Sequence, residues 1–214
     1  MPITLDPLLS PAEAEVLRAA AQALPFQDGA RTAGAIARRV KDNQQAAPGP
    51  ATQAVLDKAQ SALSANPVFR AIAYPRAFAS LMVTRTHDGG QYGAHVDNAL
   101  IAGARADLSF TLFLSEPETY EGGALVISDK TEDRAFKLPS GAAVVYPSNT
   151  LHHVTPVDRG ERLAVVGWVQ SWVADPARRE ILFDLWRAIS ATEDADQARL
   201  LSKSRSNLIR MWAT

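Results

Sequence analysis

The sequence predicts a mainly β protein with flanking α-helices, built around an antiparallel sandwich or barrel. From residue 78 to residue 173 the chain is a series of short runs rich in Val, Ile, Leu, Phe and Thr. Turn signals made of Gly, Pro, Asp and Ser separate these runs at a spacing typical of antiparallel sheets. The segments on either side carry helix signals instead, so helices are expected at both ends of the sheet region.

The N-terminal flank begins with a helix marked by a capping box. Ser10 is a suitable N-cap, a proline fills the first helical position, and Glu13 stands three residues after the cap. This helix is expected to end at about Leu24. A polar loop marked by Pro and Gly is expected over 41–50, and a second helix over 51–63.

Short strands are expected in the central section, and they cover residues 78–84, 108–114, 124–127, 142–146 and 162–173. After residue 175 the apolar residues return to helical spacing, with one apolar face over 181–189. A last helix is expected over about 193–211. We therefore expect a helical flank at 1–75, a core at 76–175 and a C-terminal helical segment at 176–214.

Composition excludes several functional classes. The net charge of −1 over 214 residues gives no basis for a nucleic-acid surface or a polybasic membrane patch. No stretch approaches the length of a membrane span, and the first residues lack the features of a signal peptide. The absence of cysteine excludes disulfide scaffolds and zinc–cysteine sites, and it fits the cytoplasmic location that we expect.

A metal site, if present, must be built from His, Asp and Glu. His95 and Asp97 are two residues apart, so in a strand their side chains would point to the same face. His152 follows a predicted strand far downstream, and a sandwich brings such distant residues together. Two histidines and one carboxylate are the ligands of the facial triad that holds non-heme Fe(II) with open coordination positions. Each residue alone also fits an ordinary structural role, as a surface pair or as a hydrogen-bonded histidine.

His153 is the rival ligand to His152. Strand alternation places the two side chains on opposite faces. We prefer His152 because of its spacing to an arginine ten residues later.

Arg162 is the expected carboxylate-binding residue. A hairpin turning at 158–160 would place it on the same face as His152, with an offset of about 13 Å at roughly 3.3 Å per residue. That distance fits a five-carbon dicarboxylate bound to iron at its other end, and arginine offers a bidentate fork for the far carboxylate. Arg159 is the competing candidate, but it lies in the turn and should face solvent.

These features together resemble the PKHD-type hydroxylases, in the prolyl 4-hydroxylase-like branch of the Fe(II)/2-oxoglutarate dioxygenases. The resemblance extends over nearly the whole chain and rests on segments 40–45, 92–97, 107–115, 120–123, 138–141, 146–148 and 152–162. It implies a double-stranded β-helix (jelly-roll) core with N- and C-terminal helices. It also assigns His95, Asp97 and His152 to Fe(II) and Arg162 to 2-oxoglutarate, with O2 as the oxidant and ascorbate as the reductant.

The chain departs from this pattern at two positions. Many relatives have a tyrosine nine residues before the first histidine, where this chain has Thr86. The residue after Gly122-Gly123 is often acidic, and here it is Ala124. The first departure removes one expected donor to 2-oxoglutarate. Tyr92 is a candidate to line the pocket, and a buried tyrosine with a structural hydrogen bond is the alternative.

The resemblance implies hydroxylation of a substrate with release of succinate and CO2, but the residues do not specify that substrate. A prolyl residue in a peptide, a free amino acid and another small metabolite are all consistent with them. Two other functions stay open, a non-catalytic iron- or ligand-binding jelly roll and a zinc hydrolase. The hydrolase would leave Arg162 without a role. An apolar C-terminal helical face that includes Trp186 and Trp212 fits a homo-oligomer, and it equally fits burial against the sandwich.

Overall fold

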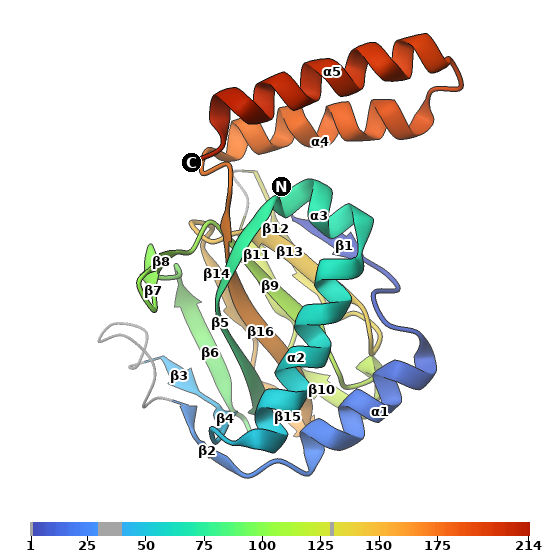
Figure 1. The fold of residues 1–214 in the computed structure, drawn as a ribbon. Helices are drawn as coiled ribbons and strands as arrows, with labels where there is room; N and C mark the ends of the chain where they lie inside the picture. The colour runs from blue at the N-terminus through green and yellow to red at the C-terminus, as the bar shows by residue number, and fades with distance from the viewer. Residues whose placement is uncertain (1, 30–39, 129–130) are drawn as a thin grey trace.

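The computed structural model describes residues 2–29, 40–128 and 131–214, and it consists of two antiparallel sheets flanked by helices (Figure 1). Within these residues, the larger sheet has seven strands in the order β1 (Ile3–Leu5), β13 (Ala143–Pro147), β9 (Leu108–Phe113), β16 (Arg162–Ser171), β5 (Pro75–Thr86), β4 (Gln44–Ala46) and β2 (Phe26–Asp28). The smaller sheet has the order β12 (Asp133–Phe136), β11 (Leu125–Ser128), β14 (His152–Val154), β6 (Gln91–His95) and β3 (Lys41–Asp42). The mainly β architecture is as predicted.

Two short strand pairs complete the described β structure. Strands β10 (Tyr120–Gly122) and β15 (Val157–Gly160) form one antiparallel pair, and β7 (Leu100–Ile101) and β8 (Ala104–Arg105) form the other. The β7–β8 hairpin lies at the rim of the space between the two sheets, where Leu100 and Ile101 line a cavity.

Hydrophobic side chains pack on both faces of the larger sheet. One cluster joins alternate residues of its strands, such as Phe110 and Val165, to three helices, α1 (Pro11–Gln22), α2 (Pro50–Ala65) and α3 (Pro67–Ala73). A second cluster lies between the sheets and joins Phe113 and Tyr146 to residues of β11 and β12. The central strands β9 and β16 therefore bury both of their faces, which explains their nearly unbroken apolar runs.

The capping box at the start of α1 is confirmed. The Glu13 backbone N–H donates to Ser10 Oγ at 3.4 Å, and the Ser10 backbone N–H donates to Glu13 Oε2 at 3.1 Å. Helix α3 was not predicted, although Asn66-Pro67 is an N-cap signal. The Asn66 side-chain oxygen accepts from the Phe69 N–H at 2.9 Å, and the helix that it caps has only seven residues.

The loop expected over 41–50 is only partly correct, because that segment contains β3 and β4. Each of these strands is two or three residues long, which is too short for an alternating pattern to be recognised. Their pairing depends on distant partners, since Lys41 lies opposite Tyr92 and Gln44 lies opposite Arg85. Strands β1, β2 and β4 add the N-terminal segment to the larger sheet, and the division at residues 75 and 175 stays a prediction.

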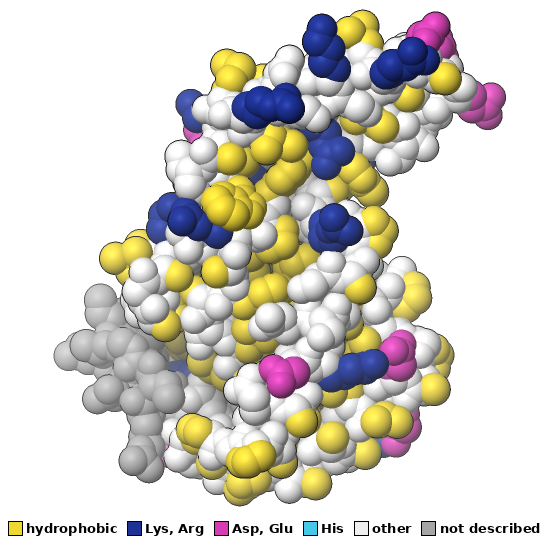
Figure 2. Space-filling view, in the orientation of Figure 1, with side chains coloured by type: hydrophobic (Ala, Val, Ile, Leu, Met, Phe, Trp, Pro, Cys, Tyr) yellow, Lys and Arg dark blue, Asp and Glu magenta, His cyan; other side chains and the backbone are white. Residues whose placement is uncertain are grey.

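The C-terminal helices α4 (Pro176–Ala191) and α5 (Ala195–Trp212) form an antiparallel hairpin that projects from the body (Figure 1). The hairpin joins the body beside α3, where apolar side chains gather between the two parts (Figure 2). At this junction Leu182 is buried, and Arg179 donates to the Val173 carbonyl at 2.7 Å. No helix in the described part of the chain is both long and apolar enough to span a membrane.

Candidate active site

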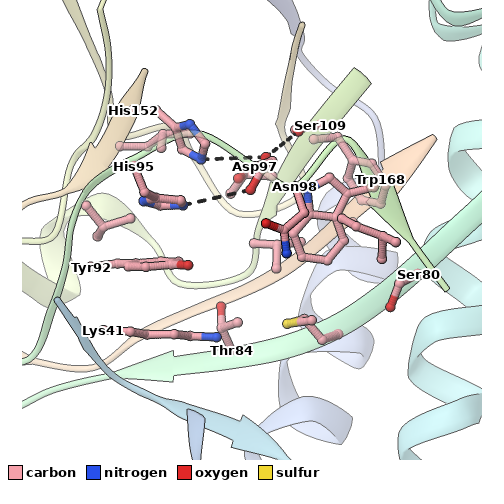
Figure 3. A pocket seen from close by; sticks show the side chains of 18 of the residues that line it. Lys41, Ser80, Thr84, Tyr92, His95, Asp97, Asn98, Ser109, His152 and Trp168 are labelled. Atoms are coloured by element: carbon pink, nitrogen blue, oxygen red, sulfur yellow. Dashed lines mark hydrogen bonds and ion pairs between the residues drawn. The ribbon is translucent and has the colours of Figure 1, made fainter. Parts of the chain in front are cut away.

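Two imidazoles and one carboxylate converge between the two sheets (Figure 3). His95 ends β6 and His152 begins β14, and the antiparallel register places these residues directly opposite each other. Asp97 Oδ1 lies 3.8 Å from His95 Nε2, and Asp97 Oδ2 lies 3.8 Å from His152 Nε2. One donor atom from each residue lies within 4.8 Å of the others, so a single metal ion could contact all three.

Hydrogen bonds fix the orientation of both imidazoles. Nδ1 of His95 lies 2.8 Å from the Gly93 carbonyl oxygen, and Nδ1 of His152 lies 2.9 Å from the Thr150 carbonyl oxygen. A carbonyl oxygen only accepts, so each Nδ1 donates a proton and each Nε2 is turned toward Asp97, where it can serve as a metal ligand. Burial, together with the neighbouring His152, lowers the pKa of His95 to about 4, which keeps this ring in its neutral, ligating form.

Asp97 is held by hydroxyl groups from the larger sheet. Strand β6 ends at His95, so the strand geometry considered for His95 and Asp97 does not apply, and the carboxylate lies two residues beyond the strand end. Ser109 of β9 donates to Asp97 Oδ2 at 2.6 Å, and the hydroxyls of Ser109 and Ser148 share a further hydrogen bond at 2.8 Å. The sequence analysis missed Ser109, although a serine within the apolar run of β9 is a signal for a buried polar contact.

Aromatic rings pack against both histidines. The Tyr92 ring stacks on His95 with centroids 3.7 Å apart, and Tyr146 meets His152 edge-on at 5.0 Å. Tyr92, which the sequence suggested as a pocket residue, lines the cavity next to the triad. These contacts restrict the imidazoles to the rotamers that turn Nε2 toward Asp97.

Arg162 is a buried cation without an anionic partner in the described structure. Arg162 is the first residue of β16 and is 2% exposed. Its Nε donates to the Gly123 carbonyl at 2.9 Å. Nη2 is buried without a hydrogen-bond partner among the described residues, and burial lowers the pKa of the guanidinium. A buried, incompletely paired cation is unfavourable unless an anion occupies the adjoining space. Thr86 lies opposite Arg162 in the register and also lines the cavity.

The hairpin proposed to relate His152 to Arg162 is wrong. Strand β14 belongs to the smaller sheet and β16 to the larger one, while the intervening β15 pairs with β10. The two residues therefore lie across the interior from each other, and the 13 Å offset along one sheet does not apply. Both nevertheless line one cavity of about 460 Å³.

The Gly122-Gly123 turn places the Gly123 carbonyl oxygen within hydrogen-bond distance of Arg162. Both glycines have positive φ, at 70° and 65°, a conformation that other residues adopt only with strain. A Cβ at Gly122 would collide with the Pro156 carbonyl oxygen. After the turn, the Ala124 backbone N–H donates to Thr155 Oγ1 at 2.9 Å. At this departure from the family pattern, the backbone is therefore held by the segment that connects β14 and β15.

The rival candidates lie away from the site. His153 pairs with Val126 and does not line the cavity. The Arg159 side chain is 80% exposed and bonds to Glu121 at 2.6 Å, which agrees with the expectation that it faces solvent. The cavity also contains residues that the sequence analysis did not nominate, among them Lys41, Asn98 and Trp168 (Figure 3).

Comparisons with known proteins identify relatives over the whole chain. Residues 81–170 match the family model described as the 2OG-Fe(II) oxygenase superfamily. The chain is 46% identical over 222 residues to a PKHD-type hydroxylase of Synechococcus elongatus, covering 100% of both proteins. It is also 46% identical over 192 residues to a PKHD-type hydroxylase of Maricaulis maris, covering 88% of each.

Solved structures show the same fold at low sequence identity. A prolyl-4-hydroxylase of Pseudomonas putida superposes with a TM-score of 0.62 at 19% identity, covering 79% of this chain and 92% of that one. A prolyl hydroxylase of Trichoplax adhaerens, solved with a peptide fragment of hypoxia inducible factor, gives a TM-score of 0.61 at 14% identity, with 79% and 83% covered.

Proposed function

Because the chain belongs to the PKHD-type hydroxylases, which are jelly-roll dioxygenases of the 2OG-Fe(II) oxygenase superfamily, we propose that it hydroxylates a C–H bond of its substrate and releases succinate and CO2. The family implies Fe(II), 2-oxoglutarate and O2 as cofactor and co-substrates. In this proposal His95, Asp97 and His152 bind the metal, and Arg162 binds the far carboxylate of 2-oxoglutarate. Ascorbate is the proposed reductant that maintains Fe(II).

The donor set supports the metal assignment. The donors are two imidazole Nε2 atoms and one carboxylate, and the side chains that carry them are 6–7% exposed. These three residues would hold Fe(II), and a facial triad of this kind leaves coordination positions open for further ligands. The hydrogen bonds to Gly93, Thr150 and Ser109 hold the ligands before metal arrives, which reduces the ordering needed for binding.

The Arg162 guanidinium, which has no anionic partner among the described residues, is the observation that carries the co-substrate assignment. It shares the cavity with the triad but belongs to the opposite sheet, so a dicarboxylate could contact both ends of this space. Its Nη2 requires an acceptor, and a carboxylate supplies one together with the compensating charge. Thr86 could donate a further hydrogen bond from the neighbouring strand.

The protein contributes binding, orientation and exclusion of water. When bound, Fe(II) and 2-oxoglutarate supply the activation of O2 and the oxidative decarboxylation that hydroxylation requires. Arg162 fixes the direction of the dicarboxylate, and the aromatic contacts of Tyr92 and Tyr146 hold the imidazoles. No general acid or base is needed beyond these residues, and none is assigned.

The substrate is proposed only by class, as a small metabolite, an amino acid or a prolyl residue in a peptide. The Trichoplax adhaerens neighbour was solved with a peptide, but its 14% identity supports the fold alone. A cavity of about 460 Å³ is large enough for a small substrate beside the co-substrate.

Anaerobic titration of the Fe(II)-loaded protein with 2-oxoglutarate tests the proposal. A visible metal-to-ligand charge-transfer band is expected in the wild type and in His153→Ala, and it should be absent in His152→Ala. Succinate should then form when O2 and a substrate are admitted. Tight retention of zinc without the band would favour a zinc hydrolase, and a band without succinate formation would favour a non-catalytic binding protein.

A further inference from the structure

A second cation lies in the cavity beside the aromatic residue that supports His95. Lys41 of β3 lies opposite Tyr92 of β6 in an antiparallel pair, so the two side chains lie on one face. Its Nζ lies 5.3 Å from the Tyr92 ring centroid, and that ring stacks on His95. Figure 3 shows Lys41, Tyr92 and His95 in successive layers, with the ammonium directed toward Thr84 of β5.

The Lys41 ammonium has no direct partner among the residues that the structure describes. Neither a hydrogen bond nor an ion pair joins it to them, and its surroundings remove enough water to lower its pKa to about 8. The negative charges of Asp28 and Asp97 oppose that shift. Lysines usually extend their charged ends into water. Retaining one in the cavity without a direct counter-ion is unfavourable unless a ligand pairs with it.

The charges of the loaded site leave Lys41 uncompensated. Among the described residues that line the cavity, the charged side chains, histidines aside, are Asp97, Arg162 and Lys41. The two positive charges of Fe(II) offset the two negative charges of 2-oxoglutarate, and Asp97 offsets Arg162. Within this lining one positive charge therefore remains at Lys41, while Asp28 acts on it from outside the cavity lining. The low dielectric of the cavity strengthens the attraction of this charge for an anion.

The wall of the cavity also contains another donor and apolar surface. Trp168 Nε1 is buried without a hydrogen-bond partner among the described residues. Met82, Leu100 and Ile101 line the same cavity. Asn43 Oδ1 is an acceptor without a partner among the described residues, but exchanging the oxygen and nitrogen of its amide would turn it into a donor. A ligand that suits this wall has acceptor oxygens at one end and an apolar body.

We propose that Lys41 binds a carboxylate of the primary substrate, and that the apolar part of this substrate packs against Trp168. The enzyme would thus take acidic substrates, either a free carboxylic acid or the terminal carboxylate of a peptide. This inference rests on the proposed function, because it assigns Arg162 to 2-oxoglutarate and Lys41 to the substrate. Lys41 is a specificity residue in this scheme and takes no part in metal binding.

Calorimetric titration with matched acid and amide probes tests the proposal. The anaerobic Fe(II)- and 2-oxoglutarate-loaded protein is titrated with N-acetylated leucine, phenylalanine and tryptophan, each as the free acid and as the amide. At least one acid is expected to bind about tenfold more tightly than its amide, as a charge-assisted hydrogen bond allows. Lys41→Met should abolish that preference, whereas Lys41→Arg should retain most of it.

Controls separate the substrate role from other roles of Lys41. Lys203→Met removes an exposed lysine of α5 and should leave the acid preference unchanged. The affinity for 2-oxoglutarate should be the same in Lys41→Met and wild type, and unchanged thermal unfolding would show that the variant folds.

Specific results would overturn the inference. Equal binding of every acid and its amide, or no binding of either, would exclude a carboxylate site at Lys41. A loss of 2-oxoglutarate affinity in Lys41→Met would assign the lysine to the co-substrate instead. A failure of the proposed function is detected independently, because the charge-transfer band with 2-oxoglutarate would then be absent before any probe is added.

Discussion

Replacing Arg162 by methionine should remove 2-oxoglutarate binding without destabilising the ligand-free protein. The change keeps an unbranched apolar side chain but deletes a guanidinium that is 2% exposed and has no anionic partner in the described structure. The variant lacks the hydrogen bond to Gly123, which destabilises it, and it lacks the buried charge, which stabilises it. These effects oppose each other, so we expect the free energy of unfolding to change by about 1 kcal/mol or less.

The loss of ligand affinity should be much larger. Without Arg162 the far carboxylate of 2-oxoglutarate would be buried and unpaired, which costs about 2–5 kcal/mol, or roughly 30-fold to several thousand-fold in Kd. At a ligand concentration of 100 times the wild-type Kd, binding stabilises the wild type by about 2.7 kcal/mol. The same concentration should stabilise the variant by less than about 1 kcal/mol.

Denaturant unfolding of the Fe(II)-loaded proteins, with and without 2-oxoglutarate under anaerobic conditions, measures both quantities. Arg159→Met is the matched control, because the Arg159 side chain is 80% exposed and pairs with Glu121 at the surface. It should behave as the wild type in both measurements. A variant at Arg162 that kept the full stabilisation by 2-oxoglutarate would refute the assignment. Destabilisation by several kcal/mol without ligand would show that Arg162 has a structural role.

Three further predictions follow from local contacts. Ser109→Ala removes the donor to Asp97 and should weaken Fe(II) affinity roughly 10- to 100-fold. Competition with a chromophoric chelator measures this affinity, and an unchanged value would contradict the positioning role of Ser109. Gly122→Ala places a side chain at a residue with positive φ, where its Cβ would collide with the backbone. It should lower the free energy of unfolding by roughly 2–4 kcal/mol. Denaturant unfolding measures this change, and an unchanged free energy of unfolding would contradict a rigid turn. The pKa of Lys41 is about 8, so its charge is present below that pH and lost above it; Asp28 and Asp97 oppose the loss. Affinity for an acid probe should therefore fall as the pH rises through 8, while affinity for its amide stays constant.

The sequence alone predicted the fold class and the chemical groups of the site. Short apolar runs between turn signals indicated the strands, and a complete capping box at Ser10 and Glu13 indicated the first helix. These patterns can be read because they depend on neighbouring residues. The small number of histidines, the spacing of His95 and Asp97, and the resemblance of ordered segments led to the triad and Arg162 before any geometry was known.

Only the tertiary structure decided how these groups meet. His152 and Arg162 are ten residues apart, yet they belong to different sheets and lie across the interior, which no local hairpin could describe. Asp97 lies beyond its strand and is oriented by Ser109 from the opposite sheet. Lys41 is in a two-residue strand, whose position depends on pairing with Tyr92 some fifty residues later. Residue type and local periodicity are set by short segments, whereas the convergence of side chains depends on how distant strands pair and how the two sheets pack.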